Sequence, residues 1–532
     1  MLIFSKSSEM GFITQFNGKP IMASRKKVFI FFGLGIICLT LAAALIFTDP
    51  ILAIAKYRTR VAINSRVHDL MKGPVTTVHI SVYLFNVTNA ERFIAGEDEK
   101  LKVEEVGPFT YREDRKFDKL EIDEAAGVMR YSPRFDPVFM PEESIAHPKD
   151  VYVTMPSFSM MTSVSMMSHH PYLSRMAFNM LAKQINSKPM VSIEAHNYLW
   201  GYEDTLLTLG HTFMPSWIQF DTLGLLDRMY DKNLEYTLEV GAKHEDKFLI
   251  KQLDGYAGLR NWNYEDPSER TKCNSFINAY EGLVYSTDLT PETPLRIFRN
   301  VLCRMLELDY HDTVTMDYGP KALLYKISNR TFQNGPDKEC TCQRGLCVDG
   351  ISDLSPCFYG LPLALSNAHF LYGGPHLFER IEGLKPDEQK HGSKILIEPK
   401  LGVVLGTTFS MQVNIVIGDA TYNEDAKRFS DMILPIGYFK IVKPALPDED
   451  KTMMYDMYIT GPYLVLAMQL ILFILGISML FHTARLLYWN WVCNGQRGME
   501  FQLCEDEKKM TVVDVDVPLM NKNSELLEKH RI

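Results

Sequence analysis

The sequence predicts an α+β protein in which two transmembrane helices flank a large ectodomain built mainly on an antiparallel sheet. One apolar run near each end of the chain predicts the helices. β-Branched, alternating segments throughout the intervening region predict the sheet. A separate block of helical periodicity inside that region predicts a small group of helices beside the sheet.

The first apolar run, Val28–Phe47, carries no charged side chain. About 20 residues at ~1.5 Å each span a ~30 Å hydrocarbon core, so residues 28–47 are the first predicted transmembrane helix and 1–27 a cytoplasmic segment. A cleaved signal peptide is the rival interpretation. It is disfavoured because Ala42, Ala43 and Ala44, the candidate cleavage residues, lie inside the run and not after it.

The second run extends from about Tyr463 to Phe481 and predicts a transmembrane helix over residues 459–481, followed by a cytoplasmic tail, 482–532. Basic residues flank the first run on both sides, so the positive-inside rule does not decide the orientation. They are Lys19, Arg25, Lys26 and Lys27 before it, and Lys56, Arg58, Arg60 and Arg66 after it.

Two further features place the intervening residues 48–458 outside the cytosol, with both termini cytosolic. Glycosylation sequons begin at Asn86 and Asn329. Six of the nine cysteines also cluster between the two runs, which is typical of disulfides in an oxidising compartment. A zinc site is the less favoured alternative for the cluster. The six are Cys273, Cys303, Cys340, Cys342, Cys347 and Cys357.

The net charge of −9 excludes the basic footprint of a nucleic-acid-binding protein. A region of this length can bury a large core as one domain or two fused units. Its predicted strands cover residues 76–84, 101–111, 322–327, 394–397, 403–409 and 411–417. Residues 398–402 end in Gly402, which suits the positive φ of a hairpin loop and makes the sheet mainly antiparallel.

Helical periodicity follows Pro171, and Pro189 limits its extent. Ser192 is predicted to cap a second short helix that ends before Gly201, and Ser216 with Gln219 has the spacing of a capping box that opens a third. The residues that carry the first periodicity are Leu173, Met176, Ala177, Met180, Leu181 and Gln184.

A methionine-rich stretch, Pro156–Met167, precedes these helices. Methionine is flexible and polarisable, so such a cluster fills a core or lines an adaptable ligand surface. Core filling is the favoured interpretation. The adjacent His169 and His170 are expected in a solvated loop and not in a metal site.

Six segments, taken in chain order, resemble those of the class B scavenger receptors, a family that includes the fatty-acid translocase and the lysosomal integral membrane protein. The resemblance covers both apolar runs and essentially the whole ectodomain. The segments are Asn86–Asn89, Glu105–Glu113, Leu199–Asp204, Ala368–Tyr372, Ile381–Pro386 and Ile397–Pro399.

The resemblance implies an antiparallel β-barrel-like body, a helical apex at about residues 157–233, and an internal apolar tunnel that leads lipid to the bilayer. It also implies three disulfides, one of the 15 arrangements that six cysteines allow. These join Cys273 to Cys340, Cys303 to Cys357, and Cys342 to Cys347.

No catalytic motif, metal set or cofactor loop is found in the sequence, so we expect no enzyme activity, cofactor or metal. The expected partners are lipids, namely fatty acids, sterols, carotenoids or phospholipids, or lipoproteins. Lys183 and Lys188 lie where family members attract anionic ligands, and ordinary exposed lysines are the equal alternative. The predicted function is a membrane receptor that passes lipid through the tunnel.

The alternative function is an endo-lysosomal sorting or adhesion receptor with a protein ligand at the apex. Its tail signal Glu525-Leu526-Leu527 departs from an acidic dileucine signal, because Lys522 replaces the acid. We therefore expect the plasma membrane first and the endosome or lysosome second. Cys493 and Cys504 are candidate palmitoylation sites, with passive thiols as the alternative.

Overall fold

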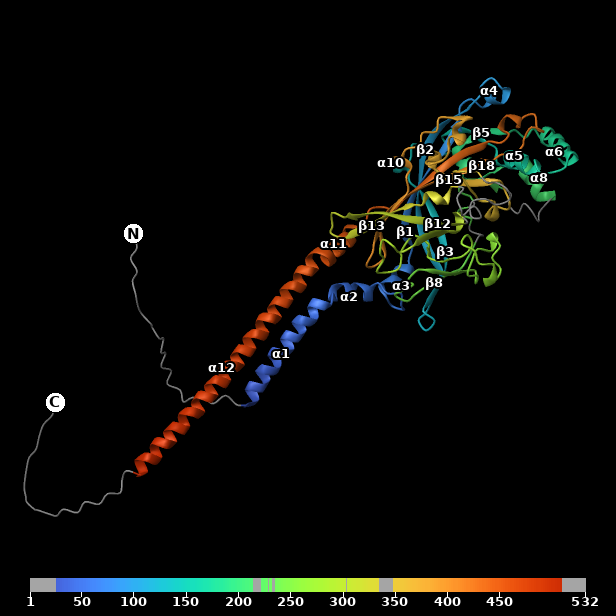
Figure 1. Ribbon diagram of the computed structural model, residues 1–532. Coiled ribbons are helices and arrows are strands. Elements are labelled where there is room, and N and C mark those ends of the chain that lie inside the picture. Colours follow the sequence, from blue (N-terminus) through green and yellow to red (C-terminus); the bar gives the residue numbers. More distant parts are fainter. Residues whose placement is uncertain are drawn as a thin grey trace, which may run out of the picture. The chain divides into compact units, whose positions relative to one another are not determined.

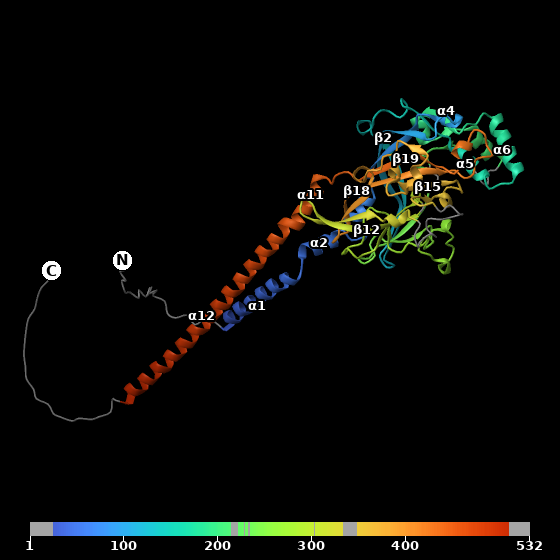
Figure 2. The ribbon, with the colours of Figure 1, turned by 45° about the horizontal axis from the view of Figure 1, so that its top comes forward.

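The computed structural model describes residues 25–213, 222–227, 229–231, 235–302, 304–333 and 348–509, without the side chains of residues 76, 77 and 492–509. The chain divides into two compact units. One contains residues 1–50 and 461–532, and the other contains residues 51–460. Figure 1 and Figure 2 show the elements of each unit from two directions.

The first unit is a pair of antiparallel helices, α1 (Arg25–Phe47) and α12 (Gly461–Lys509). Both are long and apolar enough to cross a membrane. Their apolar side chains are exposed and not packed in a core, with Phe47 87% and Phe481 71% exposed. That exposure excludes the core helices of a soluble protein. The helix predicted to end near residue 481 continues through residue 509.

Glycines bring the two helices together. A Cβ added to Gly476 would lie 2.8 Å from Leu39 Cγ and 3.1 Å from the Gly35 carbonyl oxygen. Toward the other end of the pair, the Gln469 amide donates to the Leu45 carbonyl oxygen at 2.6 Å. Small residues at a helix crossing allow this close backbone approach, and an interhelical hydrogen bond adds to it.

The second unit is built on a large sheet whose neighbours are antiparallel except for the pairs β10–β11 and β16–β2. Its main path, in spatial order, is β10 (Ala279–Tyr280), β11 (Leu295–Arg299), β12 (Arg304–Thr315), β13 (Lys321–Ile327), β17 (Lys394–Glu398), β18 (Val403–Val416), β19 (Ile433–Val442), β1 (Val75–Val87), β2 (Leu101–Asp123), β3 (Val128–Phe139), β8 (Leu238–Gly241) and β9 (Ile250–Leu253). Three short strands join it at the side: β14 (Ser352–Asp353), β15 (Leu363–Asn367) and β16 (Ile381–Glu382).

The sheet curls until its two ends share one core cluster. That cluster combines Val240 and Ile250, from the β8–β9 end, with Ala279 and Phe298, from the β10–β11 end. The body is therefore nearly closed like a barrel, as the family resemblance implies. Curling removes most of the exposed edge of a long twisted sheet.

The predicted strands are confirmed in place, with one difference. Segments 403–409 and 411–417 are one strand, β18, because Ser410 continues the backbone pairing with Lys440. The Ser410 N–H also donates to the Ser393 hydroxyl at 3.0 Å. The 398–402 hairpin is confirmed, and Gly402 has a φ of +72°.

Four helices gather at one end of the barrel-like body (Figures 1 and 2). They are α5 (Phe158–Met167), α6 (Tyr172–Gln184), α7 (Ala195–Trp200) and α8 (Thr205–Phe213), and we call them the helical block. The predicted helix after Pro171 is confirmed as α6. The remaining α-helices in the part of the chain that the structure describes are α2 (Pro50–Arg58), α3 (Arg66–Met71), α4 (Ala90–Ala95), α10 (Glu388–His391) and α11 (Asp448–Tyr455).

The prediction that Ser192 caps a helix is wrong. Ser192 lies in β5 (Met190–Glu194), which pairs with β4 (Tyr152–Pro156), and it faces Thr154 across that ladder. Cross-strand pairing overrides the local capping preference, so the helix begins after Glu194. The predicted capping box at Ser216 lies outside the described residues.

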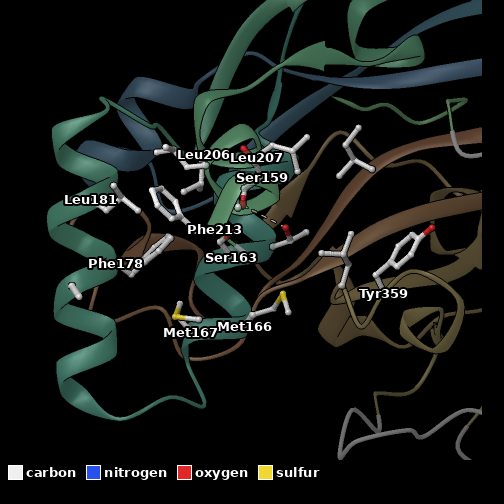
Figure 3. A pocket seen from close by; sticks show the side chains of 16 residues that line it. Ser159, Ser163, Met166, Met167, Phe178, Leu181, Leu206, Leu207, Phe213 and Tyr359 are labelled. Carbon is white, nitrogen blue, oxygen red and sulfur yellow. Dashed lines mark hydrogen bonds between the residues drawn. The ribbon is translucent and has the colours of Figure 1, made fainter. Parts of the chain in front are cut away.

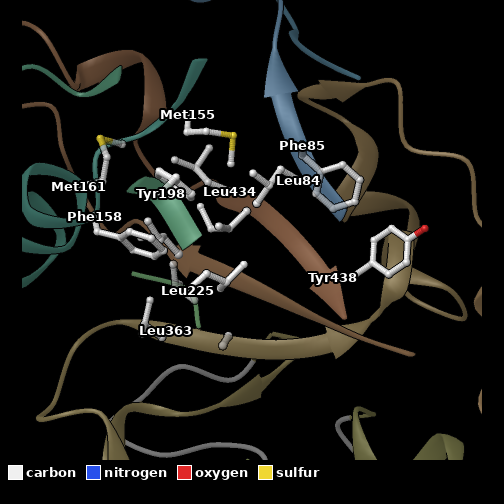
Figure 4. Close-up of a cluster of buried hydrophobic side chains, with 14 of the residues drawn as sticks. Leu84, Phe85, Met155, Phe158, Met161, Tyr198, Leu225, Leu363, Leu434 and Tyr438 are labelled. Atoms are coloured by element: carbon white, nitrogen blue, oxygen red, sulfur yellow. The ribbon is translucent and has the colours of Figure 1, made fainter. Parts of the chain in front are cut away.

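One hydrophobic core extends from the helical block into the sheet (Figure 4). Phe158 and Tyr198, from helices, stack 5.0 Å apart between ring centroids. Leu84 and Leu434, from neighbouring strands, are fully buried in the same core. The helical block is thereby fixed to the body and can present a site of defined shape.

Candidate functional site

A largely apolar cavity of about 310 Å³ lies within the helical block. Three helices, strand β7 (Thr222–Leu223) and one loop line it, and Figure 3 shows side chains converging on it. The lining residues are Ser159, Thr162, Ser163, Met166 and Met167 of α5, Ala177, Phe178 and Leu181 of α6, Leu206, Leu207, Leu209, Gly210 and Phe213 of α8, and Leu223, Tyr359 and Leu361.

Helix α5 forms the inner wall of the cavity. Its Ser157 N-cap accepts a hydrogen bond from the Met160 N–H at 3.3 Å. Met160 and Met161 are fully buried in the core, whereas Met166 and Met167 line the cavity. The methionine-rich stretch therefore both fills the core and lines the cavity, because one face of α5 packs in the core and another faces the cavity.

Helix α6 forms the outer wall. Phe178 and Leu181 face α5 and Phe213 across the cavity (Figure 3). The Asn179 amide donates to the Tyr422 carbonyl oxygen at 2.6 Å, and the Arg175 guanidinium lies 5.5 Å from the centroid of the Tyr422 ring. These contacts fix the orientation of α6 about its own axis.

The chemistry of the cavity suits an uncharged, apolar ligand. None of its described lining residues carries a charge, and its polar atoms there are hydroxyls. Two of those hydroxyls are already engaged, since Thr162 donates to the Phe158 carbonyl at 2.6 Å and Ser159 pairs with Ser157 at 3.2 Å. An apolar ligand can thus bury its surface in the cavity without depriving these two hydroxyls of hydrogen-bond partners.

The predicted capture lysines do not line the cavity. Lys183 lies exposed in the last turn of α6, and Lys188 lies exposed in the loop that follows. His169 and His170 are exposed in the turn before α6, which confirms the solvated loop expected for them.

The two sequons differ in their surroundings. Asn86 lies in β1, where its side-chain oxygen accepts the Thr154 N–H at 2.8 Å. Asn329 opens a short 3₁₀ turn, Asn329–Thr331, and is exposed. Attachment of a glycan at either position stays a prediction.

Cysteine pairing also stays a prediction. Cys273 and Cys357 are each disulfide-bonded, and their partners fall outside the described residues. Cys303, Cys340, Cys342 and Cys347 lie outside the described residues, as do the side chains of Cys493 and Cys504.

A polar cluster inside the body was missed by sequence reasoning. The His369 Nε2 lies 2.8 Å from Glu105 Oε2, which also accepts the Tyr438 hydroxyl at 3.0 Å. Burial alone would raise the pKa of Glu105, but the hydrogen bonds from His369 and Tyr438 outweigh it and lower that pKa. His391 stacks on His369, with ring centroids 4.1 Å apart.

The same cluster brings three potential metal-ligand atoms within 4.8 Å of one another. However, His369 Nδ1 accepts the Lys385 N–H at 3.1 Å, and His391 Nδ1 accepts the Asp387 N–H at 3.1 Å. A neutral ring that accepts at Nδ1 keeps its hydrogen on Nε2, whereas a metal-binding ring donates from its second nitrogen. The hydrogen bonds fit a structural clasp and not a metal centre.

The resemblance motifs map onto structural contacts of this kind. Glu105, His369 and Lys385 come from three separate motifs and meet in the clasp. From a fourth motif, the Trp200 indole donates to the Tyr111 hydroxyl at 3.0 Å. The motifs therefore define the fold, while the cavity is lined largely by residues outside them.

Two apolar helices long enough to cross a membrane, one on each side of the nearly closed β body in the sequence, define a two-anchor membrane protein. The pocket lined by apolar side chains lies in the region between them. The profile of the CD36 family matches residues 32–487, so this chain belongs to the CD36 family. The resemblance to class B scavenger receptors is thereby confirmed.

Two relatives illustrate the match. Scavenger receptor class B member 1 of Bos taurus is 24% identical over 450 residues, which cover 81% of this chain and 85% of the relative. Lysosome membrane protein 2 of Rattus norvegicus is 26% identical over 444 residues, which cover 81% of this chain and 87% of the relative.

Proposed function

We propose that this protein is a non-enzymatic scavenger-type receptor that binds lipids or lipoprotein-like ligands and passes lipid through an internal tunnel to the membrane. The observation that carries the proposal is the uncharged cavity of about 310 Å³ in the helical block. Its lining includes Leu361, which lies two residues before β15 of the barrel-like body. In this proposal the cavity is the starting point of a path into the body.

A sheltered path has a clear physical benefit. Burial of each CH₂ is favoured by about 0.8 kcal/mol, so a long-chain lipid meets a large barrier when it enters water. A cavity that accepts the lipid directly from its carrier keeps the lipid in apolar surroundings, so that the lipid does not have to enter water. The ligands that we expect are fatty acids, sterols, carotenoids or phospholipids, alone or in lipoproteins.

The site of action follows from the same proposal. Two spanning helices hold residues 48–458 on one side, and the cysteine and sequon arguments make that side extracellular or lumenal. The similarity to a class B scavenger receptor and to a lysosome membrane protein supports the plasma membrane first, with the endosome or lysosome as the second location.

The proposal is tested by filling the cavity. Ser163→Trp introduces an indole into the cavity, and Thr208→Trp places the same side chain on the exposed face of α8 as a matched control. We expect Ser163→Trp to lower cellular uptake of a labelled sterol ester or fatty acid, while Thr208→Trp leaves uptake unchanged. Surface biotinylation and thermal unfolding confirm equal expression and folding.

A second candidate is an endo-lysosomal sorting or adhesion receptor with a protein ligand on the helical block, and the similarity to Lysosome membrane protein 2 supports the location that this candidate needs. This candidate predicts the reverse pattern, in which cavity filling is harmless and surface substitutions on the block abolish a protein complex. Unchanged uptake of every lipid in folded, surface-expressed Ser163→Trp would reject the conduit in favour of this candidate.

A further inference from the structure

The segment that follows the first apolar helix exposes large apolar side chains. In α2, Ile54 is 58% and Tyr57 is 65% exposed. Ile63, in the loop after α2, is 52% exposed, and Leu70 of α3 is 56% exposed. A single exposed apolar residue is ordinary on a protein surface, whereas several close together in the chain mark a surface that meets an apolar partner.

An ion pair fixes the face that α2 turns outward. The Lys56 ammonium lies 2.6 Å from Asp288, in the loop between β10 and β11, so α2 is held against the barrel-like body. At 3.6 residues per turn, Ile54 falls on the side of α2 nearly opposite Lys56, and Tyr57 lies on the adjoining flank. The two exposed side chains therefore share a face that points away from this contact.

The charge beside the exposed face is cationic. Arg58 is exposed, and the Arg60 guanidinium carbon lies 3.7 Å from the centroid of the Tyr57 ring. Tyrosine and arginine combine an apolar stem or ring with a polar end, which suits both to the headgroup level of a bilayer. Lys56 and Arg66 are not counted, because Asp288 and Asp450 lie beside them.

The length of the connection limits how far α2 is from the bilayer. Only Thr48 and Asp49 separate Phe47 of α1 from Pro50 of α2, and three Cα steps reach at most about 11 Å. The headgroup layers extend a bilayer from a ~30 Å hydrocarbon core to about 40–45 Å in all. If α1 crosses the core, α2 begins within or just outside the headgroup layer.

The element before the second apolar helix shows the same character. Tyr455, the last residue of α11, is 46% exposed and lies a few positions before Gly461, where α12 begins. The Arg66 guanidinium of α3 lies 3.2 Å from Met453 Sδ and 3.5 Å from Asp450, so α3 and α11 contact each other. Figures 1 and 2 show α2 and α11 at the end of the body away from the helical block.

We propose that α2 is an interfacial helix that lies in the bilayer leaflet on the ectodomain side, with Ile54 and Tyr57 against the acyl chains and Arg58 and Arg60 at the phosphates. Exposed apolar side chains flanked by cations are typical of helices in a lipid interface. The partner is the phospholipid of the membrane that holds α1. This inference goes beyond the proposed function, because it holds whether or not the cavity passes lipid.

The test identifies what each exposed tyrosine touches. The photo-cross-linking residue p-benzoylphenylalanine replaces one tyrosine at a time in the full chain, held in phosphatidylcholine nanodiscs. The test position is Tyr57. Tyr463 of α12, 71% exposed, is the lipid-facing reference, and Tyr152 of β4, 67% exposed, is the matched control. After irradiation, mass spectrometry identifies the partner and the part of the lipid that is attached, and thermal unfolding verifies folding.

We expect position 57 to form adducts with lipid acyl chains at least about tenfold more often than position 152, and at a yield close to that of position 463. Ile54→Asn should lower the acyl-chain yield at position 57 severalfold, because a polar amide opposes insertion. Ile277→Asn, at a residue that is 47% exposed, is the control and should leave the yield unchanged. Equal yields at positions 57 and 152 would overturn the inference, as would adducts at position 57 with headgroups only or with protein only.

The outcome is separable from that of the proposed function. Acyl-chain adducts at position 57 should persist in a chain that also carries Ser163→Trp, whatever that substitution does to lipid uptake. Their loss in this chain would show that the lipid had reached α2 through the cavity, and it would overturn the interfacial helix. Persistence of the adducts with normal uptake would reject the conduit alone.

Discussion

Arg115 and Glu281 place an ion pair inside the barrel-like body. The Arg115 side chain is fully buried, and its Nη2 lies 2.7 Å from Glu281 Oε1. Burial alone would lower the pKa of Arg115, but the Glu281 carboxylate outweighs it and raises that pKa. The rings of Phe117 and Phe135 lie 4.9 and 5.1 Å from the guanidinium carbon.

Breaking this pair should be costly. Arg115→Met leaves the Glu281 charge buried without its partner, so we expect the unfolding free energy to fall by about 3–5 kcal/mol. The double variant Arg115→Met with Glu281→Leu should recover much of that loss, because no lone charge remains. Chemical denaturation of the expressed ectodomain measures both. Equal losses in the single and double variants would contradict this account.

His391 should make stability depend on pH. Burial, assisted by the neighbouring His369, lowers the pKa of His391 from its ordinary 6.5 to about 4. Between these values the unfolded chain binds a proton that the folded chain does not, so the contribution is complete above pH 6.5 and is lost as the pH falls toward 4. His391→Asn keeps an acceptor for the Asp387 N–H but does not titrate.

The variant should therefore show a shallower fall in melting temperature between pH 6.5 and pH 4 than the parent chain, measured by thermal unfolding in matched buffers. His170→Asn, at an exposed histidine, is the control. Parallel pH profiles for the parent and His391→Asn would show that the pKa of His391 is the same in the folded and the unfolded chain.

At this scale the sequence predicted local features better than long-range ones. Gly402 was predictable because a hairpin imposes a local φ. The meeting of Glu105 with His369, 264 positions apart, was not, because no periodicity connects them. Ser192 was mispredicted since its capping preference is weaker than a complete strand ladder.

Among the elements, α1 and α12 depend on small residues where they cross. Gly35→Leu with Gly476→Leu should separate the helices, since a Cβ on Gly476 already falls 2.8 Å from Leu39 Cγ. A cysteine pair at Phe31 and His482, whose ring centroids lie 5.1 Å apart, reports on the packing.

We expect a short bifunctional thiol reagent to link Phe31→Cys and His482→Cys in membranes, and the two leucine substitutions to reduce that yield severalfold. Cys38 is the only free cysteine among the described residues with side chains, and it is replaced by alanine beforehand. Unchanged cross-linking after the leucine substitutions would show that the glycines do not set the helix contact.

The helical block shows where periodicity stops being informative. The spacing of apolar residues predicted α6 and its limits. The spacing does not indicate which side of α6 faces solvent. That orientation depends on hydrogen bonds of α6 with Tyr422 and Asn423, which lie far along the chain. Helix α5 was not predicted, since serine and methionine give no strong helical pattern and its Ser157 cap is local to a short segment.

At the scale of the whole molecule, the membrane topology of the chain is tested first. If residues 48–458 are extracellular or lumenal, glycosidase should increase the mobility of the parent chain, and Asn86→Gln and Asn329→Gln should each remove part of that shift. The control is an added sequon within residues 1–27, which should stay unmodified. Absence of glycan at both native sites in a secretory host would remove the main support for this orientation.

The antiparallel sheet was predictable because alternating, β-branched segments occur at both flanks of the ectodomain, and its barrel-like form was implied by the family resemblance. The cavity was not predictable, since its lining comes from three helices, strand β7 and a loop near Tyr359, which are brought together only by the folded core. The motif residues named above make structural contacts, whereas the residues that line the cavity follow no comparable sequence pattern.

The strands next to the two anchors are neighbours in the sheet. His79 of β1 pairs with Val442 of β19, so the chain enters and leaves the body through one antiparallel ladder. A protease that cuts beside only one anchor leaves the ectodomain attached through the other. Shedding of this domain into the surrounding fluid would consequently require two cleavages, and a singly nicked receptor would stay on its membrane.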